Sequence, residues 1–432
     1  MRITMICIGS TGDVRPYIIL GRELKARGHD VSICAFSIFQ ETVLKEGMHF
    51  KPLPGDAKRF MGSFMNGSNG VMFLKQAKDA LVEMIDPMLE ALEAAVEDAE
   101  AIIGSYLGQV FQSLAEARRV PYIQTQYYPM DQNKYTPIAT APGQHMGPAW
   151  NLATYRLGHL AVSALEKYYL GEWREKHGMT PRKLSTAPLY EVNGHIVPVL
   201  YAMSPLIMPR PANWAENIHM TGFWLGKLED NYEPAPELKA FLEAGDPPVY
   251  IGFGSMVSDE MGETLDTVLE AVRRSGVRAI LSTGWGGVKV PQRDDLYVAE
   301  YVPHDWLFQH VSAVVHHGGA GTTAAGILAE KPTLVIPFGG DQPFWGNRVC
   351  TLGIGPKPIP RDKLNVERLT RALVDVTTSK KYAVAVRELG QRLRMESGAQ
   401  TAADIIEQEL REWLTQEGRE SAIVSDAPSM SL

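Results

Sequence analysis

Short apolar runs alternate with longer helix-favouring segments through the first half of the chain. Each run is bounded by glycine or polar residues, which is typical of buried strands. The predicted strands cover residues 2–8, 31–36, 101–104, 122–125 and about 197–203. The first helix is predicted to start at Pro16, a residue suited to a first helical turn, and to stop before Gly28. Two more helices are predicted over 87–100 and about 150–176.

The same alternation restarts near residue 249. Further apolar runs, most of them separated by helices, predict strands at 249–253, 278–281, 298–301, 313–316 and 333–337. Strands that alternate with helices form parallel, doubly wound sheets, so the predicted fold class is α/β. Two such sheets facing one another would set the carboxyl ends of their strands across one cleft, where open α/β sheets bind ligands.

A stretch rich in Pro, Asn, Asp and Glu, residues 204–248, separates the two halves. The predicted division is an N-terminal domain over 1–210, an interdomain linker over 211–245 and a C-terminal domain over 246–395. A helix over 396–414 is expected to pack back towards the N-terminal domain. The polar tail over 415–432 is expected to be disordered.

Two irregular insertions in the first half, 59–73 and 127–150, are rich in Met, aromatic residues, Pro and Gly. Ordinary loop packing is the commoner explanation for such segments. Because methionine adapts to irregular apolar shapes, the insertions could also line a pocket for an apolar ligand.

Length and composition agree with this division. A chain of 432 residues and 47.7 kDa is long for a single core. The 42 basic and 50 acidic residues give a net charge of −8, and no basic run could neutralise a phosphate backbone, so a nucleic-acid partner is not expected.

The cysteines and the apolar runs indicate the compartment. Cys7, Cys34 and Cys350 lack metal-site spacing and fit a reducing environment as buried apolar residues. The first apolar run is too short for a signal peptide, and no stretch of about 20 apolar residues occurs. The protein is therefore expected to be cytoplasmic, with no transmembrane segment.

The strongest local motif is the glycine-rich turn after the run 313–316, which continues His317-Gly318-Gly319-Ala320-Gly321-Thr322-Thr323. Its glycines let backbone N–H groups approach an anion, its threonines could cap the helix, and the first helical turn attracts negative charge. A strand-to-helix turn without a ligand is the alternative. The pattern favours a diphosphate bound by the amides of Gly319, Ala320, Gly321 and Thr322.

His317 leads this turn and could donate a ring N–H to the diphosphate as charge grows on a leaving group. The alternative is a histidine satisfied by a backbone carbonyl. His316 is expected to point to the opposite face of the strand, so the histidine pair does not predict a metal site.

Two side chains suited to sugar hydroxyls follow the next predicted strand. Asp341 supplies a carboxylate acceptor, and Gln342 supplies an amide that both donates and accepts. The alternative is that they cap the following helix. Together with the glycine turn they suggest a nucleotide sugar as ligand.

Three further positions could complete a nucleotide site. Ser255, after Gly252-Phe253-Gly254, offers a hydroxyl to the same anion, and the Val302 to His304 segment could bind a base. Trp285 could stack on that base, and a core or surface aromatic is an equally good explanation for it.

Asp13 lies in the loop after the first strand, at the expected edge of the cleft. An ordinary carboxyl pKa near 3.9 would keep it ionised, so it could accept a proton as a general base. On the residue pattern alone, the favoured alternative is that Asp13 caps the helix near Pro16 or pairs with Arg15.

Taken together, these motifs resemble those of the nucleotide-sugar-dependent glycosyltransferases of the UDP-glucosyl and glucuronosyl superfamily, especially sterol glucosyltransferases and bacterial antibiotic glycosyltransferases. The resemblance spans nearly the whole chain in order. It rests on the segments 9–17, 209–224, 302–308, 316–323 and 341–346. It implies the GT-B fold, which has two Rossmann-like domains. In that fold the N-terminal domain binds the acceptor and the C-terminal domain binds the donor.

The resemblance also implies roles for single residues. It places the catalytic base at Asp13, which overrides the capping alternative. It implies donor contacts by the following residues: Ser10, Thr11, Gly12, Ser255, Trp285, Val302, His304, His317, Gly319 to Thr322, and, on the transferred sugar, Asp341 with Gln342. Ala325 stands where plant members have a glutamate for the ribose hydroxyls, so the choice between UDP and TDP stays open.

The implied function is an inverting, metal-independent glycosyltransferase that moves a hexose, with glucose expected, to a hydroxyl of a lipophilic small molecule. The expected partners are a UDP-sugar, or a TDP-sugar, and that acceptor, with no metal or other cofactor; peripheral contact with a membrane is compatible with them. The alternatives are a nucleotide-sugar epimerase or hexosaminyltransferase on the same fold, and a non-catalytic natural-product-binding protein. An NAD-dependent oxidoreductase is disfavoured because the first loop lacks GxGxxG.

Overall fold

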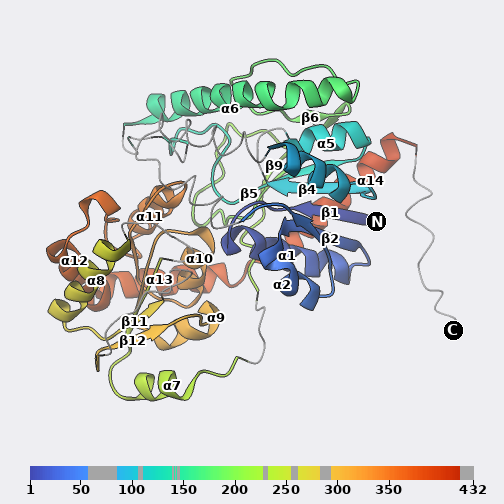
Figure 1. Cartoon of the computed structure of the whole chain (residues 1–432). Coiled ribbons are helices and arrows are strands. Elements are labelled where there is room, and N and C mark those ends of the chain that lie inside the picture. Colours follow the sequence, from blue (N-terminus) through green and yellow to red (C-terminus); the bar gives the residue numbers. More distant parts are fainter. Residues whose placement is uncertain are drawn as a thin grey trace.

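The computed structural model describes residues 1–56, 85–105, 110–138, 141, 143, 146–226, 232–253, 261–282 and 293–418. Within these residues the chain forms two parallel β-sheets with flanking helices, one sheet from each half of the sequence (Figure 1). The α/β, doubly wound class predicted from the alternating pattern is confirmed.

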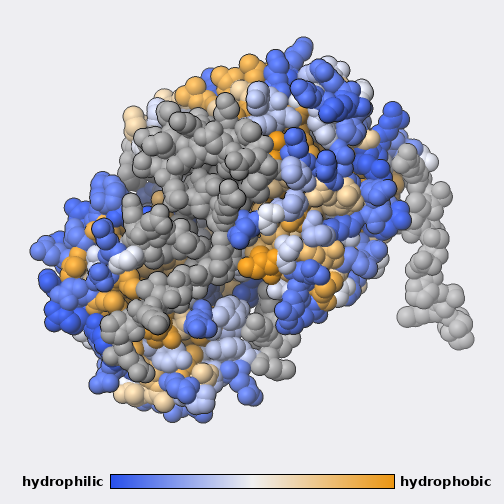
Figure 2. Space-filling model, in the orientation of Figure 1, coloured by the Kyte–Doolittle hydropathy of each residue, from blue (hydrophilic) through white to orange (hydrophobic). Residues whose placement is uncertain are grey.

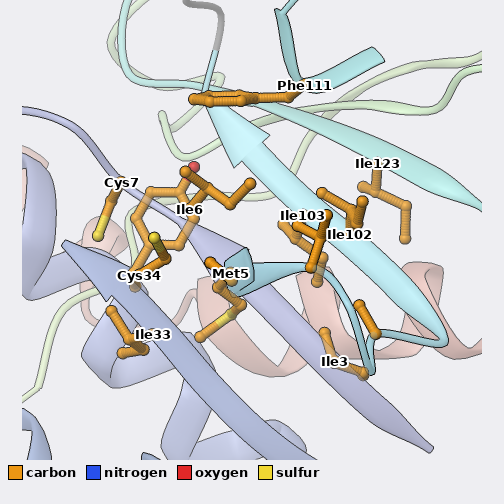
Figure 3. Packing of buried hydrophobic residues seen from close by; sticks show 14 of the residues in the cluster. Ile3, Met5, Ile6, Cys7, Ile33, Cys34, Ile102, Ile103, Phe111 and Ile123 are labelled. Carbon is orange, nitrogen blue, oxygen red and sulfur yellow. The ribbon is translucent and has the colours of Figure 1, made fainter. Parts of the chain in front are cut away.

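The N-terminal sheet has seven strands in the order β3-β2-β1-β4-β5-β8-β9, and all neighbours are parallel. The strands are β1 Arg2–Ile6, β2 Asp30–Phe36, β3 His49–Leu53, β4 Ala101–Ser105, β5 Tyr122–Gln126, β8 Val199–Tyr201 and β9 Ile218–Met220. The central strands β1, β2 and β4 are buried on both faces, as their continuous apolar runs require. Figure 3 shows Ile3, Met5 and Ile6 packed against side chains of β2 and β4.

The C-terminal sheet has five parallel strands in the order β12-β11-β10-β13-β14. They are β10 Val249–Gly252, β11 Ala279–Ser282, β12 Leu296–Ala299, β13 Ala313–His316 and β14 Thr333–Val335. In both sheets the strand order reverses at the first strand, β1 or β10. Such a switch point leaves a crevice at the carboxyl ends of the strands, so each sheet offers a ligand position there.

Helices surround these sheets. They include α1 Thr11–Ala26, α2 Gln40–Lys45, α5 Val110–Arg118, α6 Pro148–Lys176, α7 Pro236–Glu243, α8 Met261–Ser275, α9 His304–Leu307, α10 Ala320–Leu328, α11 Gln342–Thr351, α12 Val366–Thr378, α13 Lys380–Leu393 and α14 Gly398–Gln416. A two-stranded hairpin, β6 Glu191–Val192 and β7 His195–Ile196, accompanies the N-terminal sheet. None of the helices in the described part of the chain is long and apolar enough to cross a membrane.

Helix α14 lies against the N-terminal half of the molecule, although it follows the C-terminal sheet in the sequence (Figure 1). Its apolar side, with Ala403 and Ile406, belongs to the same buried cluster as β1. Arg27, at the end of α1, donates to Asp404 at 2.6 Å and to Glu407 at 3.2 Å. The chain therefore crosses between the halves twice.

Three details differ from the expected elements. Helix α1 starts at Thr11 rather than Pro16, because Ser10 serves as its N-cap. The edge strands β3 and β9 were not predicted, and the first strand ends at Ile6. Helix α14 extends to Gln416, inside the predicted tail, whereas the insertion 59–73 and tail residues 419–432 lie outside the described residues.

Candidate active site

The loops at the two switch points face one another. Asp13 follows β1, and its charge contributes to raising the pKa of Asp341, which follows β14 in the other half. The charge of Arg15, on α1, likewise contributes to lowering the pKa of His304 at the start of α9. Charges interact this way only over short distances, so residues from both halves share one site.

Asp13 occupies the third position of α1 and forms a capping box with Ser10. Its Oδ2 accepts hydrogen bonds from the Ser10 backbone N–H at 2.7 Å and from the Ser10 hydroxyl at 3.0 Å. The Ser10 hydroxyl oxygen in turn accepts from the Gly12 N–H at 3.3 Å. The residue pattern indicated Asp13 as the cap of a helix near Pro16, whereas Ser10 is the N-cap and Asp13 is its partner in the capping box. These hydrogen bonds fix the Asp13 side chain.

The surroundings of Asp13 change its acidity. Burial raises the pKa of this half-buried carboxyl above its ordinary value, and the hydrogen bonds from Ser10 oppose the increase. The expectation of an ordinary pKa is therefore not met, because the pKa of Asp13 is raised. The Tyr127 hydroxyl donates to the Asp13 carbonyl at 2.8 Å, and the rings of Tyr17 and Tyr127 meet edge to face. The Asp13 backbone is thus held by an aromatic pair from α1 and the loop after β5.

Gly9 makes room for this carboxylate. A side chain at Gly9 would overlap the carboxyl group and the Cβ of Asp13, so only glycine leaves the observed position free. Neither Gly9 nor Tyr127 was predicted as a site residue. Gly9 could have been found as a glycine directly after a buried strand, whereas the Tyr127 contact depends on the tertiary fold.

The glycine-rich turn forms the start of α10. Gly319 is the N-cap and, as a glycine, has no side chain that could cap the helix. The Thr323 hydroxyl does not cap it either, since it donates to the Gly319 carbonyl at 2.9 Å. The expectation that Thr322 or Thr323 caps the helix is therefore not met. Gly318 has φ 102°, and a Cβ there would lie 2.8 Å from Val335 Cγ1 and 2.9 Å from the Gln342 carbonyl. The amides of Ala320, Gly321 and Thr322 begin the helix, which is the arrangement that attracts anions.

The two adjacent histidines occupy different environments. His316 is fully buried, and its Nδ1 accepts from the Gly318 N–H at 3.0 Å. His317 is half-buried and its Nε2 lies at the turn, since a Cβ on Gly319 would come within 2.7 Å of it. Burial lowers the pKa of His317 to about 4, so its imidazole is neutral at physiological pH.

The segment Val302 to His304, which was expected to contact a nucleotide base, leads into α9 and lies near His317. Burial, with the charges of Arg15 and His317, lowers the pKa of His304 to about 3. Its Nε2 lies 3.0 Å from the Tyr250 hydroxyl, and its ring stacks on Phe308. The Val302 side chain is buried, so only its backbone could meet a base.

Asp341 and Gln342 begin α11 with different tasks. Asp341 occupies the N-cap position without capping; its Oδ2 instead accepts from Trp345 Nε1 at 2.8 Å. Burial raises the pKa of Asp341 to about 7, the Trp345 bond lowers it, and the Asp13 charge adds to the increase. Gln342 Oε1 accepts from the backbone N–H groups of Phe338 at 2.7 Å and Gly339 at 3.2 Å, so this side chain orders the loop.

The structure thus brings together Asp13, His304, His317, Asp341 and the start of α10. Ser255 and Trp285 lie outside the described residues. Trp345 was not predicted, although its position four residues after Asp341 on a helix is a spacing that brings two side chains together. Contact of each predicted residue with a donor stays a prediction.

Family models match both halves of the chain. The model described as the glycosyltransferase family 28 N-terminal domain matches residues 3–136. The model described as the erythromycin biosynthesis protein CIII-like C-terminal domain matches residues 287–412.

Two relatives match almost the entire chain in sequence. The sterol 3-beta-glucosyltransferase of Neosartorya fischeri is 36% identical, over 99% of this chain and 31% of that protein. The sterol 3-beta-glucosyltransferase UGT80A2 of Arabidopsis thaliana is 35% identical, over 92% of this chain and 64% of that protein. The chain therefore spans between 31% and 64% of the length of these relatives.

Solved structures agree in fold. The glycotransferase of kitacinnamycin has a TM-score of 0.70 at 21% identity, covering 95% of this chain and 99% of that one. The calicheamicin glycosyltransferase CalG4 has a TM-score of 0.68 at 17% identity, covering 95% and 98%. SsfS6 of Streptomyces sp. SF2575, complexed with thymidine diphosphate, has a TM-score of 0.61 at 17% identity, covering 94% and 99%.

Two parallel sheets whose switch-point loops face one another define the GT-B fold, and the solved structures share it. The chain belongs to the UDP-glycosyltransferase superfamily, as the relatives and both family models show.

Proposed function

We propose that the protein is a glycosyltransferase that moves a hexose, expected to be glucose, from a UDP-sugar or TDP-sugar to a hydroxyl of a lipophilic acceptor. The proposed reaction inverts the anomeric carbon and uses no metal ion. The observation that carries the proposal is that Asp13 lies close enough to Asp341 to raise its pKa, while the turn before α10 packs against the neighbouring Gln342 carbonyl. A base and a diphosphate site must flank the transferred sugar.

Asp13 is the proposed general base. Oδ2 is held by Ser10, and the acceptor hydroxyl would give its proton to Oδ1 while its oxygen attacks the anomeric carbon. The bond from that carbon to the diphosphate breaks on the opposite side, and the nucleoside diphosphate leaves with the electron pair. A pKa raised by burial makes the carboxylate a stronger base than an exposed aspartate, provided it is ionised at the working pH.

The start of α10 and His317 are proposed to receive the departing diphosphate. Backbone N–H groups at a helix N-terminus stabilise an anion without a counter-cation, which supports a metal-independent reaction. A neutral His317 retains one ring N–H, which can donate to a phosphate oxygen. Asp341, oriented by Trp345, is proposed to accept from the sugar hydroxyls.

The choice of substrates rests on the relatives. Both are named sterol 3-beta-glucosyltransferases, which supports a glucosyl donor and a lipophilic alcohol as acceptor. A structure with the same fold is complexed with thymidine diphosphate, so TDP-sugars belong in the first donor panel.

A single assay tests the proposal. The full chain is incubated with UDP-glucose or TDP-glucose and a mixture of lipophilic alcohols, and glycosides are sought by mass spectrometry. The wild type should form a glycoside, whereas Asp13→Asn should lower kcat by about 100- to 10,000-fold and still bind UDP. Unchanged turnover in Asp13→Asn would remove Asp13 from the mechanism. Donor binding without transfer to any acceptor would favour the natural-product-binding alternative.

A further inference from the structure

Tyr128, in the loop after β5, lies between the proposed base and the acid proposed to bind the sugar. Its neighbour Tyr127 donates to the Asp13 carbonyl at 2.8 Å. The Tyr128 side chain packs against the buried cluster that contains Trp345, and Trp345 Nε1 donates to Asp341 at 2.8 Å. Hydrophilic side chains cover much of the described surface in Figure 2, whereas this cluster lies inside the molecule. A side chain of the N-terminal half is thus placed beside site residues of both halves.

The loop that carries Tyr128 is fixed by hydrogen bonds to strand β8. The Tyr201 hydroxyl on that strand accepts from the backbone N–H groups of Met130 and Asp131, both at 3.0 Å. The same hydroxyl donates to Asp131 Oδ2 at 2.6 Å, and both side chains are buried. A side chain on such an ordered loop loses little conformational entropy when a ligand binds, so Tyr128 is suited to a specific contact.

The Tyr128 hydroxyl makes no hydrogen bond in the described part of the chain, whereas the hydroxyls of Tyr155 and Tyr201 nearby are hydrogen-bonded. A half-buried phenol ordinarily finds a partner, so this hydroxyl is available to a ligand. Burial, together with the charges of Asp341 and Asp13, raises the pKa of Tyr128. Such charges act over short distances, so both carboxylates lie near a hydroxyl that keeps its proton and can donate.

A protonated phenol beside a carboxylate complements a sugar hydroxyl. That hydroxyl can donate to ionised Asp341, which only accepts, and at the same time accept from Tyr128. We propose that the Tyr128 hydroxyl donates to a hydroxyl of the transferred sugar, so that the protein selects a hexose bearing that hydroxyl over the deoxysugar that lacks it. The inference rests on the proposed function, because it extends the sugar-binding role of Asp341.

The selection follows from the cost of leaving a polar group unpaired. With the deoxysugar bound, the Tyr128 hydroxyl would be enclosed without a partner. A site that hydrogen-bonds a substrate hydroxyl therefore discriminates against the analogue without it. The acceptor is a poorer candidate for this contact, since the charge of Asp341 acts on Tyr128 more strongly than that of Asp13.

Isothermal titration calorimetry with the full chain tests the proposal. The ligands are UDP, UDP-glucose and the analogues of UDP-glucose that each lack one sugar hydroxyl. Tyr128→Phe keeps the ring in the cluster and removes only the hydroxyl. The variant should bind UDP like wild type and UDP-glucose about three- to tenfold more weakly, which is the effect of one hydrogen bond.

The deoxy donors identify the contacted hydroxyl. For one analogue, the loss of affinity relative to UDP-glucose should be about three- to tenfold smaller in Tyr128→Phe than in wild type, because the variant has no such hydrogen bond to lose. For the other analogues the loss should be equal in both proteins. This pattern separates a direct contact from a general change of the site, which would affect every donor alike.

Tyr135→Phe is the matched control. Tyr135 belongs to the same loop and exposes 50% of its surface, so its variant should bind every ligand like wild type. Thermal unfolding checks that both variants are folded.

Three results would overturn the proposal: unchanged affinity of Tyr128→Phe for UDP-glucose, equal weakening of UDP and UDP-glucose, or the absence of any single analogue that the variant and wild type treat differently. Binding needs neither an acceptor nor turnover. A wild type that binds the donors in the expected pattern but forms no glycoside would contradict the proposed function and leave the assignment of Tyr128 in place.

Discussion

At the scale of single residues, Asp13 shows that a capping role and a catalytic role need not exclude each other. The capping box uses Oδ2 and ties the carboxylate to Ser10. When the acceptor binds, a base that is already held in one position loses less conformational entropy than a mobile one. The residue pattern indicated a capping role but assigned the cap to Asp13, whereas Ser10 is the N-cap and Asp13 its partner in the capping box. The proposed chemistry follows from the proximity of Asp13 to Asp341 in the other half.

Ser10→Ala separates these roles. Loss of the hydroxyl removes the cap to the Gly12 N–H and one hydrogen bond to Asp13, so unfolding free energy should fall by about 1 kcal/mol. Because that bond lowers the pKa of Asp13, its loss raises the pKa. The acidic limb of the kcat/KM profile should therefore move to higher pH, with activity largely retained at alkaline pH. An unmoved limb would show that Asp13 does not set it.

Trp345→Phe tests how Asp341 is oriented. The variant keeps an aromatic ring in the core and removes the N–H that donates to Asp341 Oδ2. That bond opposes the increase that brings the pKa of Asp341 to about 7, so its loss raises the pKa further and leaves more of the acid protonated at neutral pH. The donor KM should rise about tenfold, less at alkaline pH, while kcat changes little. If the donor KM rose equally at every pH, the cause would be altered packing around residue 345 rather than the protonation of Asp341.

At the scale of elements, the sequence pattern predicts the central strands of the sheets better than the edge strands. The strands β1, β2 and β13 are mostly apolar because, apart from the first residue of β1 and of β2, they are buried. Strand β3 is half-exposed, and its Pro52 is tolerated because the strand forms the edge of the sheet. Its weaker pattern explains why it was missed.

The same contrast holds for the candidate site. The turn before α10 is encoded by consecutive glycines, so it was visible locally. The bonds from Tyr127 to Asp13 and from Arg15 to the Gly226 carbonyl join segments far apart in the sequence. No local pattern encodes such pairs, because only the folded sheet brings their segments together.

Two glycines of the turn make a matched test of this element. Gly318 has a positive φ, and a Cβ there would crowd Val335 and the Gln342 carbonyl, whereas a Cβ on Gly321 meets nothing within 4 Å. Gly318→Ala should lower the unfolding free energy by about 2–4 kcal/mol through strain and overpacking. Gly321→Ala should leave it unchanged or slightly higher, since alanine favours a helix. Urea unfolding measures both, and equal losses would contradict the role assigned to Gly318.

At the scale of the whole molecule, the two halves share a buried apolar junction. Tyr201, Met203 and Phe223 from the first half pack in one cluster with Ile327 and Trp345 from the second. Beside this cluster the two crossing segments meet backbone to backbone, as a Cβ on Gly398 would lie 2.7 Å from the Gly222 carbonyl carbon. Any movement of one half relative to the other must therefore change these contacts. Glu396 lies beside Gly222, so a change in its charge would affect the packing of the two halves.

Glu396 is an ionisable group at that junction. Its Oε1 accepts from the Ser204 hydroxyl at 2.7 Å, and its Oε2 is buried without a hydrogen-bond partner in the described part of the chain. Burial raises the pKa of Glu396, against the opposing effects of Ser204 and Arg392. The folded state therefore holds this proton more tightly than the unfolded chain. Stability should fall as pH rises from the unfolded pKa, about 4.3, through the folded one.

Glu396→Gln tests this coupling, because the amide keeps an acceptor for Ser204 and carries no charge. The variant should unfold at higher urea than wild type at neutral pH, and the difference should vanish below the unfolded pKa, where wild-type Glu396 is also neutral. Ser204→Ala should act in the opposite sense, since it removes the hydrogen bond that supports the charged form, and its cost should grow with pH. If either difference were the same at both pH values, the effect would come from packing at the junction rather than from the buried charge.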